Sequence, residues 1–167
     1  MTGKNYHLLV TITFLIPSGV VYAQSAGGTP LFSYSRLWPI HMVLMSISFA
    51  HLLTGMVVSA FMKKKKWWLA VHRRLQWIGG GSGIAGLATA VYMVSVSSGS
   101  HFRLLHSALG LVGIVMIASG LIVGLSIFRV RNEKKKTFRL VHRWLGRATL
   151  ALMAVIIASG LTIAGII

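Results

Sequence analysis

Four long apolar stretches, at 37–62, 67–96, 102–129 and 138–167, constrain this chain more than any other feature. Each is long enough, as a helix rising about 1.5 Å per residue, to cross about 30 Å of hydrocarbon. Charged residues make up only 11% of the chain, whereas a typical soluble domain contains about 25%. The stretches therefore predict an all-α integral membrane protein, folded as a bundle of four transmembrane helices.

Basic residues gather in two of the three linkers, at 63–66 and 129–136, and the third linker, at 97–101, is mostly serine and glycine. The positive-inside rule places the two basic linkers in the cytoplasm and both ends of the mature chain outside. We expect the prokaryotic cell (inner) membrane, with anionic lipid around the lysines. Despite a net charge of +16, this distribution argues against nucleic acid as a partner.

Two shortages limit the chemistry. The chain has one acid, Glu133, which excludes carboxylate pairs and acid-rich calcium sites. It has no cysteine, which excludes disulfides, thiolate metal sites, cysteine-bound iron–sulfur clusters and covalently attached haem c.

The N-terminus is typical of an export signal. Lys4 precedes an apolar run, and Val21-Tyr22-Ala23 fits a cleavage site. We predict a signal peptide at 1–23, a short exported segment at 24–36 and one transmembrane domain at 37–167. An additional uncleaved membrane helix is the alternative.

The chain contains an internal repeat. When His41 is aligned with His106, Gly55 meets Gly120, and when His72 is aligned with His142, Arg73 meets Arg143. Two successive helical hairpins in the same orientation predict a pseudo-twofold axis along the membrane normal. The first stretch should then neighbour the third across the centre, and the second should neighbour the fourth.

The repeat supplies one histidine per stretch, in two pairs. His41 and His106 lie near the exported ends, and His72 and His142 lie near the basic linkers. Ionisable residues in a membrane usually face an interior partner. Two facing histidines suit axial ligation of haem iron, whereas zinc normally takes three or four protein ligands. The pattern predicts two stacked b-type haems, and the alternative for any one histidine is a hydrogen-bonded core residue.

Other residues fit this interpretation. Gly55, Gly86 and Gly120 each follow a histidine by fourteen residues, which leaves room for a macrocycle or allows close helix packing. The fourth stretch breaks this pattern with Ile156. His51 lies off the ligand face, and we interpret it as a packing or hydrogen-bonding residue, with a redox role or substitution as a ligand as the alternative. Basic residues at each level are candidates to bind haem propionates, and membrane-interface snorkelling is their alternative role: they are Arg36, His101 and Arg103 at the exported level, and Arg73, Arg74, Arg143 and Arg147 at the other.

The chain resembles the cytochrome b561 family, in particular its four-helix core. The segments that carry the resemblance are HMVLM at 41–45, LAVHRRLQ at 69–76, LHSALG at 105–110 and VHRWLGR at 141–147. The resemblance implies that His41 pairs with His106, and His72 with His142, to bind two haem b groups that pass electrons across the membrane. Many members have six helices, and this chain has only the four core stretches after its signal. The best-known donor of the family is ascorbate, and Lys66, Arg73 and Arg74 occupy the comparable zone; quinol or a partner protein is the alternative donor.

The leading functional hypothesis is a di-haem electron conduit, an oxidoreductase or electron carrier. It would join a small-molecule or protein donor to an acceptor, such as ferric iron or a redox protein, on the opposite face. The second is a haem-binding anchor that transfers electrons as a subunit of a partner oxidoreductase, and a homodimer is also open. The third, a small transporter, is disfavoured because the stretches contain no carboxylate for proton coupling.

Overall fold

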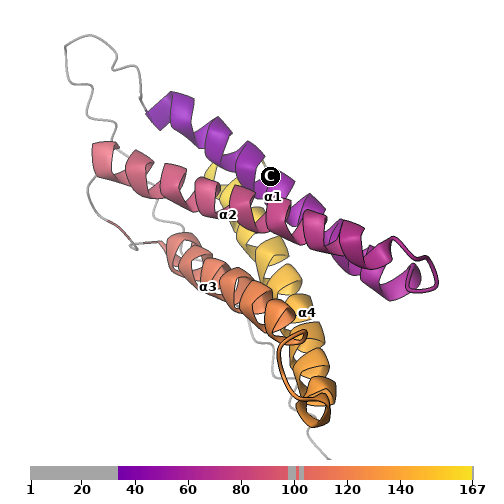
Figure 1. Ribbon diagram of the computed structural model, residues 1–167. Coiled ribbons are helices and arrows are strands. Elements are labelled where there is room, and N and C mark those ends of the chain that lie inside the picture. The colour runs from indigo at the N-terminus through magenta and orange to yellow at the C-terminus, as the bar shows by residue number, and fades with distance from the viewer. Residues whose placement is uncertain (1–33, 98–100, 102–103, 167) are drawn as a thin grey trace, which may run out of the picture.

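The computed structural model describes residues 34–97, 101 and 104–166, and this part of the chain forms four helices. They are α1 (Tyr34–Phe61), α2 (Trp68–Ser97), α3 (Leu105–Ser126) and α4 (Asn132–Ile163) (Figure 1). All four are long and apolar enough to cross a membrane, which confirms the predicted bundle. The expected signal peptide, most of the short exported segment and Arg103 lie outside the described residues.

The helix boundaries lie within four residues of the expected ones except at the start of α4. α4 begins at Asn132, six residues earlier than expected, and α3 ends at Ser126, three residues earlier. Lysine is a good helix former, and Glu133 in the first turn of α4 interacts favourably with the helix dipole. The lysines at 134–136 therefore lie outside the fourth apolar stretch but inside the first turns of α4.

The helices pack as two hairpins, α1 with α2 and α3 with α4, and the hairpins meet through α2 with α3 and α1 with α4 (Figure 1). Among these helices, α1 and α3 do not touch through their backbones, and neither do α2 and α4. The repeat-related helices therefore face each other across the centre as diagonal partners. They are held apart and are not packed as neighbours.

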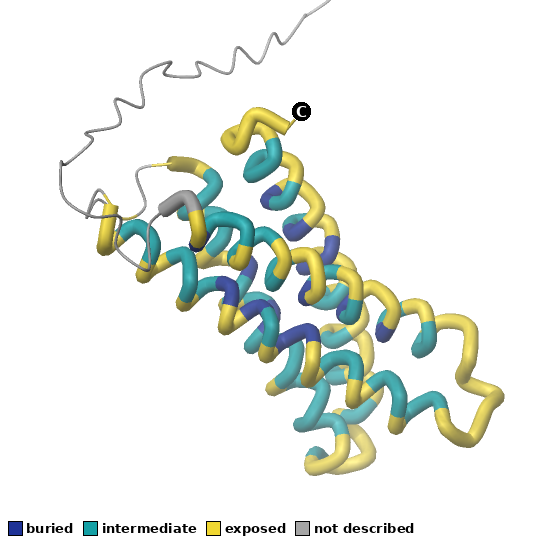
Figure 2. The backbone as a smooth tube through the Cα atoms, turned by 90° about the horizontal axis from the view of Figure 1, so that it is seen from above, coloured by how far each residue is buried: buried dark blue, intermediate teal, exposed yellow. Residues whose placement is uncertain are grey.

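Eight buried residues fall at two fixed positions after the histidines. Small residues lie seven positions on, and the residues eleven positions on are also buried. Figure 2 shows the buried residues on the inner sides of the helices and the exposed residues on their outer sides and at the loops. The two sets are Ser48, Gly79, Gly113 and Thr149, and Leu52, Gly83, Ile117 and Met153. The hydroxyl of Ser48 donates a hydrogen bond to the carbonyl of Gly79 at 2.7 Å, which ties α1 to α2.

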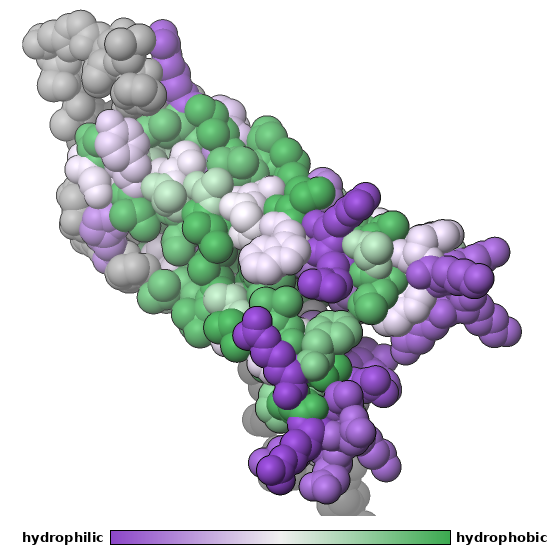
Figure 3. All heavy atoms as spheres, viewed as in Figure 1, coloured by the Kyte–Doolittle hydropathy of each residue, from purple (hydrophilic) through white to green (hydrophobic). Residues whose placement is uncertain are grey.

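The two hairpins diverge toward their basic loops (Figure 1). Figure 3 shows polar side chains gathered at this end and apolar side chains over most of the remaining visible surface. We call it the basic end, defined by residues 63–66 and 129–136. The two hairpins are therefore farthest apart at the basic end.

Candidate functional site

The four repeat-related histidines meet as two pairs across the diagonals of the bundle. The imidazole centroids of His41 on α1 and His106 on α3 are 6.4 Å apart, and those of His72 on α2 and His142 on α4 are 6.1 Å apart. The ring planes are nearly perpendicular in both pairs, at 82° and 90°. Within the described residues, no cluster of three or more histidines, cysteines or acids is present, so each site offers two nitrogen ligands.

Each of the four imidazoles is oriented by a hydrogen bond from Nδ1 to a backbone carbonyl of the other helix in its hairpin. A carbonyl oxygen only accepts, so Nδ1 carries the proton and Nε2 keeps a free lone pair. Metal-binding histidines are commonly oriented through the second ring nitrogen in this way. The bonds are His41 to Gly86 at 2.8 Å, His72 to Gly55 at 2.8 Å, His106 to Ile156 at 3.0 Å and His142 to Gly120 at 3.1 Å.

The separation of the rings fits a single metal ion between each pair. A five-membered ring with bonds of about 1.35 Å has a radius of about 1.15 Å, and a metal–imidazole bond is about 2 Å long. Two rings on opposite sides of one metal ion therefore have centroids about 6.3 Å apart. The observed values of 6.4 Å and 6.1 Å agree with this estimate, so the histidines fit axial ligation of haem iron.

The four acceptor carbonyls explain the fourteen-residue spacing. Each acceptor lies fourteen residues after the histidine on its own helix, which is about 21 Å along the axis. Ile156 accepts the hydrogen bond of His106 through its backbone carbonyl. The fourth helix therefore keeps the fourteen-residue spacing of the acceptors, although this position is not a glycine. The same rise separates the two histidine pairs along the bundle.

The glycines at these acceptor positions differ in what surrounds them. A Cβ at Gly86 would meet Sδ of Met45 at 2.8 Å, and one at Gly55 would collide with the amide of Gln76, so close packing explains both. A Cβ at Gly120 would meet nothing within 4 Å, and Gly120 lines a cavity. Room for a macrocycle therefore exists at Gly120 and not at the other two.

Two further glycines let the histidine rings approach. A Cβ at Gly124 would lie 2.9 Å from Cε1 of His142, and a Cβ at Gly160 would lie 2.9 Å from Cε1 of His106. Both glycines stand eighteen residues after the histidine on their own helix. The fourteen-residue comparison of the sequence does not select either glycine, but alignment of the third and fourth stretches on His106 and His142 shows the shared spacing.

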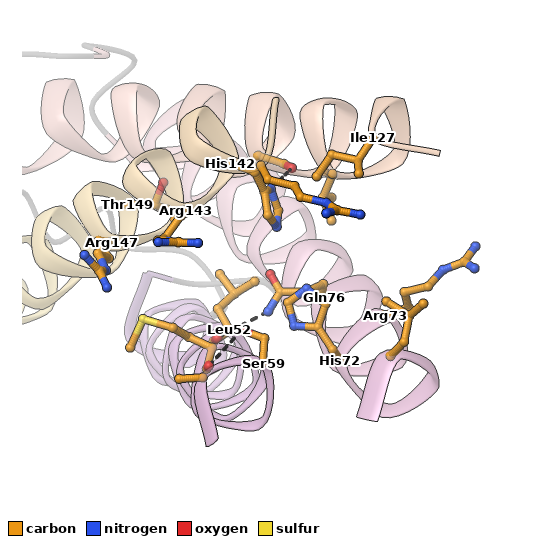
Figure 4. Close-up of a pocket in the computed structure, with 18 of the residues that line it drawn as sticks. Leu52, Ser59, His72, Arg73, Gln76, Ile127, His142, Arg143, Arg147 and Thr149 are labelled. Carbon is orange, nitrogen blue, oxygen red and sulfur yellow. Dashed lines mark hydrogen bonds between the residues drawn. The ribbon is translucent and has the colours of Figure 1, made fainter. Parts of the chain in front are cut away.

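A cavity of about 970 Å³ surrounds the His72–His142 pair and opens at the basic end. Figure 4 shows the two imidazoles pointing toward each other, with Arg143 and Arg147 on one side and Arg73 on the other. Gln76 also lines the cavity and donates a hydrogen bond to the carbonyl of Leu52 at 3.3 Å. Of the arginines expected at this level, Arg73, Arg143 and Arg147 line the cavity.

The remaining candidates lie elsewhere. Arg74 is exposed and is not among the residues that line this cavity, and Arg36 is exposed at the start of α1. His101 is exposed and lies 3.3 Å from the hydroxyl of Ser95. His51 bonds to the carbonyl of Ile47 in its own helix at 2.8 Å, in agreement with the expected hydrogen-bonding role.

These features define a class: a bundle of four helices able to span a membrane, in which two pairs of oriented histidines lie about 21 Å apart along the helices. A family model described as eukaryotic cytochrome b561 matches residues 40–167. The chain belongs to the cytochrome b561 family, whose members transfer electrons across membranes with haem b. No curated protein and no solved structure was found to match it.

Proposed function

We propose that this chain is a transmembrane electron conduit that holds two haem b groups, one at each histidine pair. The observation that carries the proposal is that all four imidazoles are held in the same way, with Nδ1 bonded to a carbonyl and Nε2 left for a metal. His41 and His106 would be the axial ligands of one haem, and His72 and His142 those of the other. Bound haem supplies one-electron chemistry at its iron.

The protein's own residues position and insulate these sites. Each carbonyl bond fixes the rotation of its imidazole and raises the basicity of Nε2. The apolar side chains of Leu52, Ile117 and Met153 pack together between the two levels and exclude water. With one imidazole from each histidine of a pair as ligands, a bound haem iron would have no open coordination position, which would favour electron transfer over oxygen binding. A macrocycle is wide, so the edges of two haems would approach far closer than the 21 Å rise.

The topology follows from the basic loops. With residues 63–66 and 129–136 in the cytoplasm, the His72–His142 pair lies near the cytoplasmic face and the His41–His106 pair lies near the exported face. Electrons would pass between a donor on one face and a redox protein or ferric iron on the other. Dependence on an added partner protein would identify a subunit of a larger oxidoreductase instead.

The test is haem quantification on detergent-purified protein, by pyridine haemochrome and by the reduced-minus-oxidised visible spectrum. We expect about two haem b per chain with sharp low-spin α bands. About one haem per chain would mean that one histidine pair is wrongly assigned. Protein without haem, from cells supplied with haem, would overturn the proposal.

A further inference from the structure

The two sides of the cavity at the basic end differ in charge, although the repeat makes them equivalent in backbone. On α4, Arg139, Arg143 and Arg147 follow one another at four-residue spacing, so they lie on one helix face, and all three line the cavity. The equivalent positions on α2 are Leu69, Arg73 and Trp77, which also line it. We call the three α4 residues the arginine ladder. Arg139 and Arg147 are thus additions to the repeat, whereas Arg143 has its counterpart in Arg73.

Arg147 is the member of the ladder that lies deepest between the two histidine levels, so its positive charge most needs an explanation. It stands two residues before Thr149, which lies midway between His142 and Ile156, so its Cα is near the level halfway between the histidine pairs. Its guanidinium stacks on the ring of Trp144, 5.1 Å from the ring centroid. A cation at this depth in a membrane is costly and normally has a functional partner.

The chain itself has almost nothing negative to offer this cation. Glu133 is the only acid, and it lies fourteen residues before Arg147, about 21 Å away along the helix axis. The anion that neutralises the deep end of the ladder must therefore come from a bound molecule. Arginine forms strong, often bidentate hydrogen bonds with carboxylates.

The opposite side of the cavity is better suited to an apolar edge. There the guanidinium of Arg73 lies over the ring of Phe128, 5.6 Å from its centroid, and Trp77 occupies the position equivalent to Arg147. A haem has both carboxylates on one edge and apolar substituents on the others. The cavity thus offers the arginine ladder on its α4 side, and Arg73 together with the aromatic residues Phe128 and Trp77 on the other side.

We infer that the arginine ladder binds the propionates of the haem at the His72–His142 pair, with Arg143 and Arg147 as the contacts. The inference rests on the proposed function and adds a direction to it. The carboxylate edge of this haem faces the α4 side of the cavity, next to α1, and its apolar edge faces Trp77 and Phe128. The ladder would select one of the two ways in which the macrocycle can enter between its ligands.

The test uses holoprotein that carries haem labelled with ¹³C at the propionate carboxyls. Redox-difference infrared spectroscopy reports on these carboxylates directly, and a spectroelectrochemical titration gives the midpoint potentials. The variants are Arg147→Gln, Arg147→Lys and, as a control for net charge, Arg129→Gln. Arg129 is exposed in the loop after α3 and is not among the residues that line the cavity. Each variant is also made in a His41→Ala background, so that the haem at the basic end is observed alone.

We expect Arg147→Gln to keep its haem, to shift the labelled carboxylate bands and to lower the midpoint potential of this haem. The potential falls because a nearby cation disfavours the more positive ferric state, and its removal relieves that effect. Arg147→Lys should restore much of the potential, and Arg129→Gln should match the parent protein.

Three results would overturn the inference. The first is an Arg147→Gln variant whose bands and potential equal those of Arg129→Gln. The second is a band shift in Arg73→Gln that is absent in Arg147→Gln, because the propionates would then lie on the other side. The third is loss of co-purified anionic phospholipid from Arg147→Gln with unchanged carboxylate bands, which would make the ladder a lipid site. A parent protein without haem would refute the proposed function itself, and the haem count separates that failure from these three.

Discussion

His72 donates a hydrogen bond from Nδ1 to the carbonyl oxygen of Gly55, 2.8 Å away. Gly55 lies on α1, which also carries His41. His41 donates the equivalent hydrogen bond to the carbonyl of Gly86 on α2, the helix that carries His72. One hairpin therefore orients a histidine at each of the two levels, and each helix supplies both a donor and an acceptor. The second hairpin repeats the arrangement with His106, Ile156, His142 and Gly120. Neither histidine pair is built by one hairpin alone, because each pair takes one ring from each.

Removal of one histidine should empty one site and leave the other. We expect His72→Ala to lower the haem content from about two to about one per chain, because six-coordinate low-spin iron needs both axial ligands. The measurement is pyridine haemochrome quantification per mole of purified protein. His51→Ala is the control, since its ring bonds only to the carbonyl of Ile47 in the same helix. Equal haem loss in the two variants would contradict the assignment.

Gly124 and Gly160 should be intolerant of a single methyl group. In Gly124→Ala the new Cβ would lie 2.9 Å from Cε1 of His142, so the ring must move from its bond to Gly120. We expect reduced haem content and a broadened, partly high-spin spectrum, measured by visible and electron paramagnetic resonance spectroscopy. Gly160→Ala should do the same at the His106 site.

Gly110→Ala provides the matched control on α3, because a Cβ there would meet nothing within 4 Å. Alanine has the higher helix propensity, by about 1 kcal/mol, so this variant should keep its haem and be at least as stable. If Gly110→Ala and Gly124→Ala lose haem equally, helix packing rather than ring clearance explains the glycines.

The number of helices and the pairing of the four repeat-related histidines could be predicted from the sequence, because both depend on strong sequence signals. A run of about 20 apolar residues has few structures open to it in lipid, where every backbone polar group must be bonded within the chain. The repeat then aligns His41 with His106 and His72 with His142. The structure adds that these residues meet across the diagonals.

The parts that the sequence did not predict depend on which side of a helix faces which neighbour. Close packing at Gly55 and Gly86 becomes evident only when Gln76 and Met45 are seen to fill the space beside them. Ile156 looked like an exception because sequence comparison detects side chains, whereas the hydrogen bond uses a carbonyl. The start of α4 at Asn132 was missed because charge marks the edge of the hydrocarbon and not the end of a helix.

Ser48 should contribute a modest interhelical hydrogen bond. Its side chain is 0% exposed, and its hydroxyl donates to the carbonyl of Gly79 on the neighbouring helix at 2.7 Å. We expect Ser48→Ala to lower the free energy of unfolding by about 0.6 kcal/mol and by at most about 1.7 kcal/mol, the range measured for such bonds in membranes. The measurement is unfolding in mixed detergent micelles, followed by tryptophan fluorescence.

Ser82→Ala tests whether the interhelical nature of that bond matters. The hydroxyl of Ser82 donates to the carbonyl of Ile78 within its own helix at 2.8 Å, so its loss removes no link between helices. We expect almost no change in the free energy of unfolding. A larger loss for Ser82→Ala than for Ser48→Ala would show that the bond to Gly79 does not stabilise the hairpin.

Met153 should be the most sensitive side chain between the two histidine levels. It is 1% exposed and packs with Leu52, Ile117 and Leu150 in the centre of the bundle. We expect Met153→Ala to lower the free energy of unfolding by about 2–5 kcal/mol, because the packed surroundings relax only partly into the vacated volume. Val155→Ala, at a position 56% exposed, should change the free energy of unfolding by about 0.5 kcal/mol or less.

Haem content at both sites should remain in Met153→Ala, since Met153 is not a ligand, so electron transfer between the haems can be measured in the same variant. Flash-photolysis kinetics should show slower transfer, because a gap replaces packed atoms between the sites. A Met153→Ala variant as stable as Val155→Ala, with unchanged transfer kinetics, would show that this core neither supports the bundle nor conducts between its two sites.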